Sequence, residues 1–422
     1  MNFPRTLHHS DPVACGCDGA PGLVPVDRAM AKGLALVSPV QEVEALPLGS
    51  ATGRVLARAI AAPVPFPLFD NSAMDGYACR LADLAGQGPW VLPVAGRICA
   101  GDAPPVLPAG AALRMLTGAP LPQGADVVIA QEHVRRQGEA IAIAAKPRAG
   151  QHIRRAGDDL AHGMPLLQAG RNIGAREAAA LAGAGLAEFA VRRRVRVAVL
   201  CSGSELAAPG TPLQPGQIWD ANHAMLAAAL ERPWITRVAL PPCADDPQAL
   251  RDAVGQAAAQ ADIVITTGGV SVGDEDHMAA VIRQLGGQVE VMKLAIKPGK
   301  PLSIGQIGGA LWLGLPGNPV AAFVTWHVIG QVLAGRMAGL AKPGPAKTLA
   351  ALAEPIRHKP GRCEYRPARL LGHDARGVLQ AICLDGAGSH RIAQLAQADA
   401  LVMIPADIEA MARGDLVELL PL

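Results

Sequence analysis

The feature that most constrains this chain is an alternation of apolar runs and helix-forming stretches within residues 191–341. The order along the chain is an apolar run at Val195–Leu200, a helical stretch at Asn222–Glu231, a run at Trp234–Leu240, a helix opened by Asp246-Pro247, and a run at Asp262–Thr267. Strands that alternate with helices of about 10–15 residues predict a mostly parallel sheet covered by helices.

The second half of this region contains no Asp, Glu, Lys or Arg from Pro301 to Gly335. Its length would allow a transmembrane span. However, the segment Leu315-Pro316-Gly317-Asn318-Pro319 interrupts it with a loop whose backbone would lack hydrogen-bond partners in lipid. We therefore expect a strand at Ala310–Leu315 and a buried helix at Pro319–Leu333 that begins with proline, and no membrane partner.

The regions on either side consist of short apolar runs broken by Gly and Pro, which favours β-structure. The upstream runs are Val91–Val94, Ala112–Leu116, Ala125–Gln131 and Ala140–Ala144, and the downstream runs are Leu349–Glu354, Cys363–Leu371, Val378–Cys383, Ala400–Ile404 and Leu416–Leu419. Helices are expected at Val26–Val37 and Arg176–Ala187. The predicted fold class is α/β plus β, in the order β, α/β, β.

Composition and cysteine spacing exclude several classes of function. The 422 residues carry 38 Lys and Arg against 36 Asp and Glu, far from the basic excess that binds nucleic acid non-specifically. Residues 1–22 include Cys15 and Cys17 but no continuous apolar core, so we interpret them as a disordered leader and expect a cytoplasmic protein. One C-x-C pair does not make a zinc site, and the sequence supports no Ser-His-Asp or Cys-His arrangement.

A glycine-rich segment, Thr266–Gly273, leaves an apolar strand and leads through Asp274, Glu275 and Asp276 into a helix. Ligands of open α/β sheets bind at that edge, and paired glycines before a helix N-terminus suit a phosphate. The adjacent carboxylates would then need Mg²⁺ to offset repulsion. The alternative is that these acids only favour the first helical turn, and the spacing leaves both interpretations open.

Other loops at strand ends carry charge. Glu205 follows the first strand of the sheet, and Asp245 precedes Asp246, which we interpret as a helix N-cap. Lys293 and Lys297 flank a Pro-Gly turn and would suit a small anion. Each of these residues also has a simpler interpretation as part of a solvated turn.

Two polar segments of the upstream β-region, Phe69–Ala78 and Thr117–Pro120, are not explained by periodicity, although ordinary turns could account for them. Acids, lysines and glycine-rich backbone together indicate phosphate or oxyanion chemistry assisted by Mg²⁺.

In combination, these motifs resemble the molybdopterin molybdenumtransferase family, which includes the E domain of gephyrin. They are Phe69–Ala78, Thr117–Pro120, Thr267–Gly273 with Asp276, Lys293–Pro301 and Leu315–Val320. The resemblance implies an elongated homodimeric subunit. Its implied parts are a discontinuous dimerisation domain (23–67 and 149–190), an inserted β domain (68–148), a molybdopterin-binding α/β domain (191–341) and a C-terminal β-barrel (342–422).

The resemblance also implies a reaction, in which molybdenum from molybdate enters adenylylated molybdopterin and AMP is released, with Mg²⁺ as the metal. The implied catalytic residues are Asp75, Thr117, Asp159, Glu205, Asp245, Asp276, Lys293 and Lys297, of which Glu205, Asp245 and Asp276 would serve the metal. The implied cofactor-binding residues are Thr267, Gly268, Gly269, Ser271, Gly273, Pro316, Gly317, Asn318, Arg362 and Ser389.

Two departures from the family and two alternative functions remain. The leader through Gly22, with Cys15 and Cys17, has no counterpart in the family. The sequence has Ser202-Gly203-Ser204-Glu205 where the family often has Thr-Gly-Asp-Glu, so one acid is absent. The alternatives are a molybdopterin adenylyltransferase, an enzyme that could also be a partner, and a non-enzymatic gephyrin-like scaffold or molybdate-binding protein.

Overall fold

The computed structural model describes residues 22–240, 246–268, 277–384 and 388–422. The chain divides into two compact units. One comprises residues up to Ala57, Gly170–Gly174 and Phe189–Leu422, and the other comprises Arg58–Ala169 and Ala175–Glu188.

The larger unit is built on a six-stranded sheet with the order β16-β13-β17-β21-β20-β18. The strands are β16 (Ile235–Val238), β13 (Val195–Cys201), β17 (Ile263–Thr267), β21 (Ala310–Leu315), β20 (Pro301–Ile307) and β18 (Gln288–Lys293). The first four are parallel, whereas β20 and β18 are antiparallel to their neighbours. The predicted, mostly parallel sheet is therefore confirmed.

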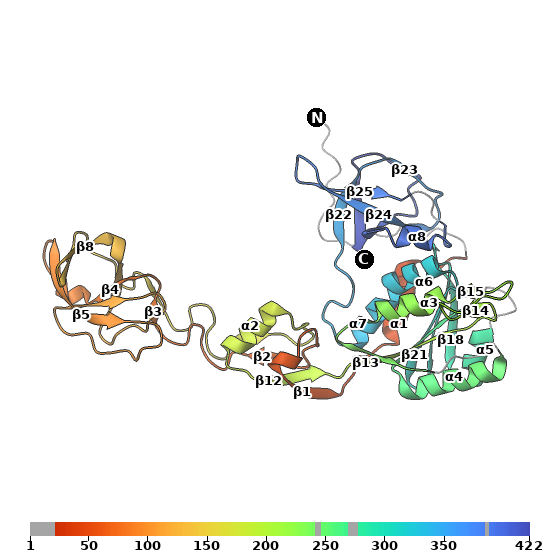
Figure 1. Ribbon diagram of the computed structural model, residues 1–422, viewed down its shortest axis with the longest axis horizontal. Helices are drawn as coiled ribbons and strands as arrows, with labels where there is room; N and C mark the ends of the chain where they lie inside the picture. Colours follow the sequence, from red (N-terminus) through yellow and green to blue (C-terminus); the bar gives the residue numbers. More distant parts are fainter. Residues whose placement is uncertain (1–21, 241–245, 269–276, 385–387) are drawn as a thin grey trace. The chain divides into compact units, whose positions relative to one another are not determined.

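Helices cover both faces of this sheet (Figure 1). On one face lie α1 (Val26–Ala35), α3 (Ala221–Ala229), α6 (Pro319–Thr325) and α7 (Gln331–Met337), and on the other lie α4 (Pro247–Gln260) and α5 (His277–Gln284). Alternation along β13 explains the two layers, because Val195 and Val197 belong to the first core and Ala198 and Leu200 to the second.

The helix after β21 runs from Pro319 to Met337 through one π-helical segment at Trp326–Gly330. It is long and apolar enough to cross a membrane, but 78% of its most apolar stretch is buried inside the protein. This is the arrangement of a core helix, as the interrupting loop at residues 315–319 predicted.

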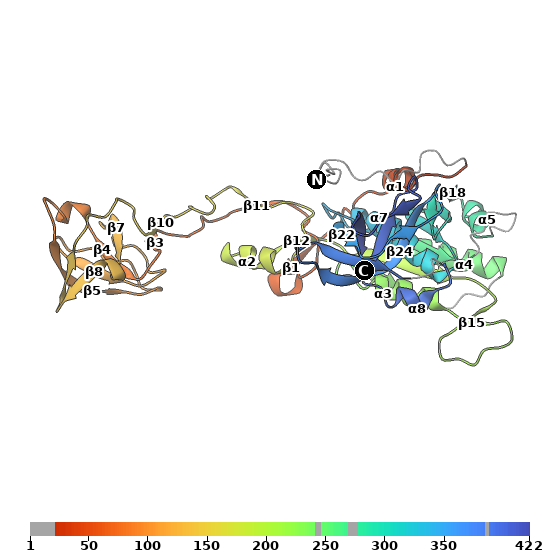
Figure 2. The same ribbon diagram turned by 90° about the horizontal axis from the view of Figure 1, so that it is seen from above.

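A long loop connects β14 (Leu206–Ala207) to β15 (Ile218–Trp219) (Figure 2).

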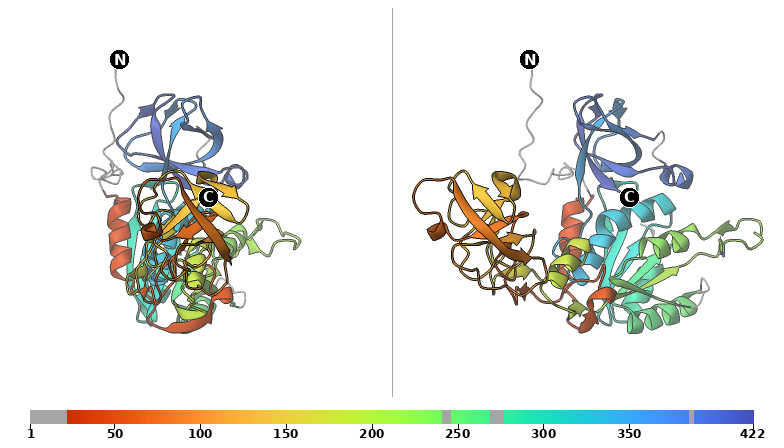
Figure 3. Two further views of the ribbon diagram at one scale, coloured as in Figure 1. Left: turned by 90° about the vertical axis from the view of Figure 1, so that its left-hand side faces the viewer. Right: turned by 60° about the vertical axis from the view of Figure 1, so that its left-hand side comes forward.

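The C-terminal strands of the larger unit form a closed barrel (Figure 3). Its strands are β24 (Cys363–His373), β25 (Leu379–Cys383), β22 (Thr348–Leu352), β28 (Leu416–Pro421) and β26 (Ala400–Ile404), which pairs back to β24. The short strand β19 (Ile296–Lys297) pairs with β24, so the barrel and the α/β domain share a ladder at Lys297. The helix α8 (Ile392–Leu395) and the pair β23 (Ile356–Arg357) and β27 (Ala410–Met411) complete the barrel region.

The smaller unit contains a second six-stranded sheet, ordered β7-β4-β6-β5-β9-β8. These strands are β7 (Val127–Ala130), β4 (Gly76–Cys79), β6 (Ala112–Met115), β5 (Trp90–Ile98), β9 (Ala140–Ile143) and β8 (Val134–Gln137). The unit also has the pairs β3 (Asn71–Ser72) with β10 (Ile153–Arg154) and β2 (Ile60–Ala61) with β11 (Pro165–Leu167), and the helix α2 (Ala175–Gly183). The predicted β-region is confirmed.

Candidate functional site

A cleft of about 970 Å³ lies between the carboxyl ends of the α/β strands and the barrel of the larger unit. Residues from loops far apart in the sequence line it. Seven of them were predicted from the sequence: Glu205, Lys297, Pro316, Gly317, Asn318, Arg362 and Ser389. The strand-end loops therefore do meet, and two residues of the barrel region lie with them.

Thr267 and Gly268 contact two residues that line this cleft, Asn222 and Gly317. Gly268 has φ +86°, and a Cβ there would lie 2.3 Å from the carbonyl oxygen of Ser202, so only glycine fits. The side-chain amide of Asn222 donates to the carbonyl of Gly317 at 2.7 Å and to Thr267 Oγ1 at 3.3 Å. Asn222, which the sequence analysis missed, thus joins the two glycine-containing loops.

Glu205 is placed by the loop that leaves β13. Its carboxylate oxygens lie 2.6 and 2.7 Å from the position that a Cβ on Gly203 would take. A side chain at Gly203 would therefore displace the carboxylate. The glycine of the Ser-Gly-Ser-Glu segment accordingly has a local role in presenting an exposed acid to the cleft.

Lys297 is held from the barrel side by Glu364, a second residue that the sequence analysis missed. The Lys297 Nζ lies 3.3 Å from the carboxylate of Glu364, which is fully buried and also receives a 2.8 Å hydrogen bond from Arg366 Nε. Burial alone would raise the pKa of Glu364, but the hydrogen bonds and charges of Arg366 and Lys297 hold it below its usual value. Glu364 therefore stays ionised and fixes the lysine at the cleft.

The segment Lys293–Pro301 supplies two lysines to the cleft, but only one of them was predicted. Lys300 lines the cleft together with Lys297. Lys293 is exposed at the end of β18, where it pairs with Pro301, and is not among the lining residues. The predicted role of Lys293 stays a prediction.

In the smaller unit, the two polar segments predicted to be functional lie against each other. The Asp75 carboxylate accepts hydrogen bonds from the backbone N–H and the hydroxyl of Thr117, both at 2.8 Å. The Thr117 N–H is the main reason that the pKa of Asp75 lies below its usual value. Asp159 is exposed, and its backbone N–H donates to Phe66 O. Asp75 is therefore an ionised carboxylate whose loop is held in place by its hydrogen bonds with Thr117.

The donors at the cleft suit a hard cation. Glu205 and Asp220 supply carboxylate oxygens, and the buried Oδ1 of Asn222 has no hydrogen-bond partner among the described residues. Oxygen ligands of this kind are those that Mg²⁺ prefers. The residues present therefore fit the metal that the resemblance implies.

Comparisons with known proteins now decide the family. Family models match residues 24–185 ("MoeA N-terminal region (domain I and II)"), 198–335 ("Probable molybdopterin binding domain") and 350–422 ("MoeA C-terminal region (domain IV)"). Molybdopterin molybdenumtransferase 2 of Mycobacterium tuberculosis is 38% identical over 378 residues, which is 87% of this chain and 92% of that protein. The chain belongs to the molybdopterin molybdenumtransferase family.

Other molybdopterin molybdenumtransferases and solved structures agree. The Haemophilus influenzae protein is 34% identical over 94% of this chain and 98% of its own length. Two structures of the molybdopterin biosynthesis moeA protein of Pyrococcus horikoshii have TM-scores of 0.80 at 27% identity and 0.76 at 31% identity, over 95% and 94% of this chain and 100% and 99% of theirs. The predicted family, fold class and enzyme class, a transferase of molybdenum cofactor biosynthesis, are confirmed.

Several residues predicted for this molybdopterin molybdenumtransferase lie outside the described residues. They are Asp245, Gly269, Ser271, Gly273 and Asp276. The leader with Cys15 and Cys17 also lies outside them. Their roles stay predictions.

Proposed function

We propose that this chain inserts molybdenum from molybdate into adenylylated molybdopterin and releases AMP, in an Mg²⁺-dependent reaction in the cytoplasm. The observation that carries the proposal is the cleft, which gathers acids, cations and glycine-rich backbone at the carboxyl edge of a parallel sheet. Ligands of open α/β sheets bind at this edge.

Cations from both domains of the larger unit suit the tetrahedral dianion molybdate. Lys297, Arg362 and the hydroxyl of Ser389 all line the cleft. Lys297 supplies a point charge, whereas Arg362 can present two N–H groups to two oxygens of one anion. We propose that these three residues seat molybdate beside the substrate.

We further propose that Glu205, Asp245 and Asp276 hold Mg²⁺. The ion would offset the repulsion between the phosphate of the adenylylated substrate and molybdate. The residues of this chain would hold the reactants close together, which is itself a large part of such a rate enhancement. The absence of an acid at Ser204 leaves the site with fewer carboxylates than the family often has.

Asp75, Thr117 and Asp159 belong to the smaller unit, and we propose that they act in a homodimer, in which they serve the cleft of a second copy. The hydrogen bonds between Asp75 and Thr117 support the view that this loop has a fixed shape and an ionised carboxylate. A monomer in sedimentation analysis, with full activity, would contradict this part.

The deciding experiment measures AMP release from adenylylated molybdopterin with and without molybdate and Mg²⁺. We expect release to depend on both, and no molybdate-dependent release would refute the proposal. A parallel reaction with molybdopterin and ATP tests the adenylyltransferase alternative. Molybdate binding without turnover, unaffected by Asp276→Ala, would favour a scaffold or molybdate-binding protein.

A further inference from the structure

A thiol, a carboxylate and an imidazole meet at the end of β13. Cys201 is the last residue of β13, Asp220 is the N-cap of α3, and His223 lies in the first turn of α3. The Sγ atom, a carboxylate oxygen and a ring nitrogen of these three residues all lie within 4.8 Å of one another. The sequence analysis found no Cys-His arrangement, and the fold creates this one.

Rigid elements hold each of the three residues. Cys201 is paired with Thr267 in the β13–β17 ladder. Asp220 accepts the backbone N–H of His223 at 2.9 Å through Oδ1, and its own N–H donates to Ala207 O at 2.9 Å. The N-cap bond uses one carboxylate oxygen, and the carboxylate also lies beside the Cys201 thiol. Groups that are already placed lose little conformational entropy when they bind a ligand together.

The set of donors is that of a transition metal rather than of Mg²⁺. Zinc binds Cys, His and Asp at about 2.0–2.3 Å, which places its ligand atoms about 3–4 Å apart, and small side-chain rotations would close that distance here. Three protein ligands leave a fourth position for water or a ligand. We propose that Cys201, Asp220 and His223 bind a divalent transition metal, with zinc the best match.

The surroundings support this assignment. A hollow of about 350 Å³ opens onto the three residues and is otherwise lined largely by apolar groups, among them Val199, Ala208 and Pro209. It has room for a fourth ligand, and its apolar wall limits competition from water. A bound metal would take the thiolate form of Cys201 and displace its proton.

The proposed metal site is separate from the Mg²⁺ proposal but adjoins it. Asp220 lines both the large cleft and the smaller hollow. Metal binding by Cys201, Asp220 and His223 can be measured without any molybdenum insertion. Its failure would therefore leave the proposed molybdenum insertion untouched, and the reverse also holds.

The test uses the full-length protein, freed of metal by a chelator and titrated with Co²⁺ in the presence of excess Mg²⁺. We expect one tight equivalent with a thiolate-to-cobalt charge-transfer band, and displacement by Zn²⁺. Cys201→Ser should abolish the band, and His223→Ala should weaken binding by more than about 100-fold, since even outer partners of a metal site cost 10–100-fold. Asp220→Asn keeps an N-cap oxygen and should also weaken binding.

The matched control is Cys383→Ser, because Cys383 is also a half-buried free cysteine and is also the last residue of its strand, β25. This variant should bind Co²⁺ as the wild-type protein does. A band that persists in Cys201→Ser, or equal Zn²⁺ affinity in the wild-type protein and His223→Ala, would overturn the proposal. Thermal unfolding of each variant shows whether it is folded, and Asp220→Asn still decides the matter if Cys201→Ser is not.

Discussion

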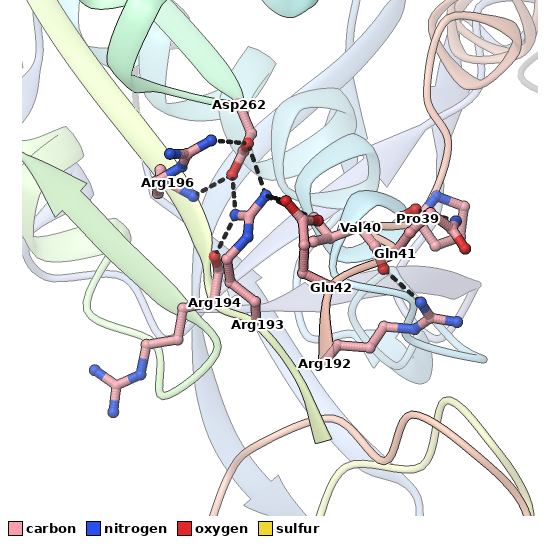
Figure 4. A network of polar contacts seen from close by, with 9 residues as sticks. All are labelled: Pro39, Val40, Gln41, Glu42, Arg192, Arg193, Arg194, Arg196 and Asp262. Carbon is pink, nitrogen blue, oxygen red and sulfur yellow. Dashed lines mark hydrogen bonds and ion pairs between the residues drawn. The ribbon is translucent and has the colours of Figure 1, made fainter. Parts of the chain in front are cut away.

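The two ends of the strands in the six-stranded sheet, called here its amino and carboxyl edges, carry charged residues in opposite arrangements. At the amino edge, Asp262 is saturated: it accepts hydrogen bonds from Arg193 Nη1 at 2.7 Å, from the Arg196 N–H at 2.7 Å and from Arg196 Nη2 at 3.0 Å (Figure 4). Arg193 also reaches Glu42. At the carboxyl edge, Glu205 is exposed to an open cleft. Saturated charge holds the fold together, whereas charge left open can bind a ligand.

The partly buried carboxylate of Asp262 and the fully buried carboxylate of Glu364 differ in what they hold in place. Burial alone would raise the pKa of Asp262, and the hydrogen bonds from Arg193 and Arg196 outweigh it, so the pKa lies below its usual value. In Glu364, too, hydrogen bonds and nearby positive charges outweigh the effect of burial on the pKa. Unlike Asp262, however, Glu364 is paired with Lys297, which lines the cleft. We therefore expect loss of Asp262 to affect stability alone, and loss of Glu364 to affect the site as well.

The largest effect is expected from Lys297→Ala at the open edge. Removing a charged group that faces the reacting anion should lower molybdate-dependent AMP release by about 10²–10³-fold. The free energy of unfolding should change little, because Glu364 keeps Arg366. Lys347→Ala is the matched control, since Lys347 is paired with Glu418 in the barrel and is not among the cleft residues. Equal activity of the two variants would break the comparison.

At the saturated edge, Asp262→Ala should lower the free energy of unfolding by about 3 kcal/mol, because the partly buried Arg193 then keeps only the exposed Glu42 as a carboxylate partner. The AMP-release activity of the folded fraction should stay unchanged. Chemical denaturation provides the measurement. Glu231→Ala is the control, since its pair with Arg237 is exposed, and such pairs are worth about 0–1 kcal/mol. A matching loss in both variants would contradict the assignment.

Much of this fold could be predicted from periodicity. Continuous apolar runs were equally informative: the run Ala400–Ile404 is a strand with those bounds, and all of its residues are buried. The helix predicted at residues 176–187 ends earlier, at Gly183, where glycine weakens it. The strands β18 and β20 were not predicted. β18 mixes polar and apolar residues and forms no continuous apolar run, and β20 lies inside the uncharged stretch, of which only the strand after the Gly308-Gly309 turn was predicted.

The site was predictable only where a loop motif carries it. Glu205, Lys297 and Gly317 belong to local segments rich in polar residues, glycine or proline. Helix or strand periodicity does not explain that composition, and the structure places all three residues at the cleft. Asn222 and Glu364 are single polar residues within regular elements. Their importance arises from contacts with distant segments, which a single sequence does not display.

A smaller effect is expected from Glu364→Gln, which removes the charge opposite Lys297 but keeps a hydrogen-bonding side chain of the same size. Lys297 should then be less well positioned, so that the KM for molybdate rises by about tenfold, as for outer partners of a binding site, and kcat changes less. Steady-state kinetics at varied molybdate measure the split. A fall in kcat with an unchanged KM would show that Glu364 does not act through the seat of the anion.

The smallest effect is a pH dependence that separates the saturated carboxylate from an exposed one. The pKa of Asp262 in the folded protein is lowered from 3.8, so its stabilisation is fully present above that value and is lost as the pH falls through the folded pKa. The difference in unfolding free energy between the wild-type protein and Asp262→Asn should thus be constant from about pH 7 to 5 and shrink below about pH 4. Urea midpoints across this range measure it, with Glu231→Gln as the exposed control. A difference that stays constant to the lowest pH would show that Asp262 contributes through packing rather than through its charge.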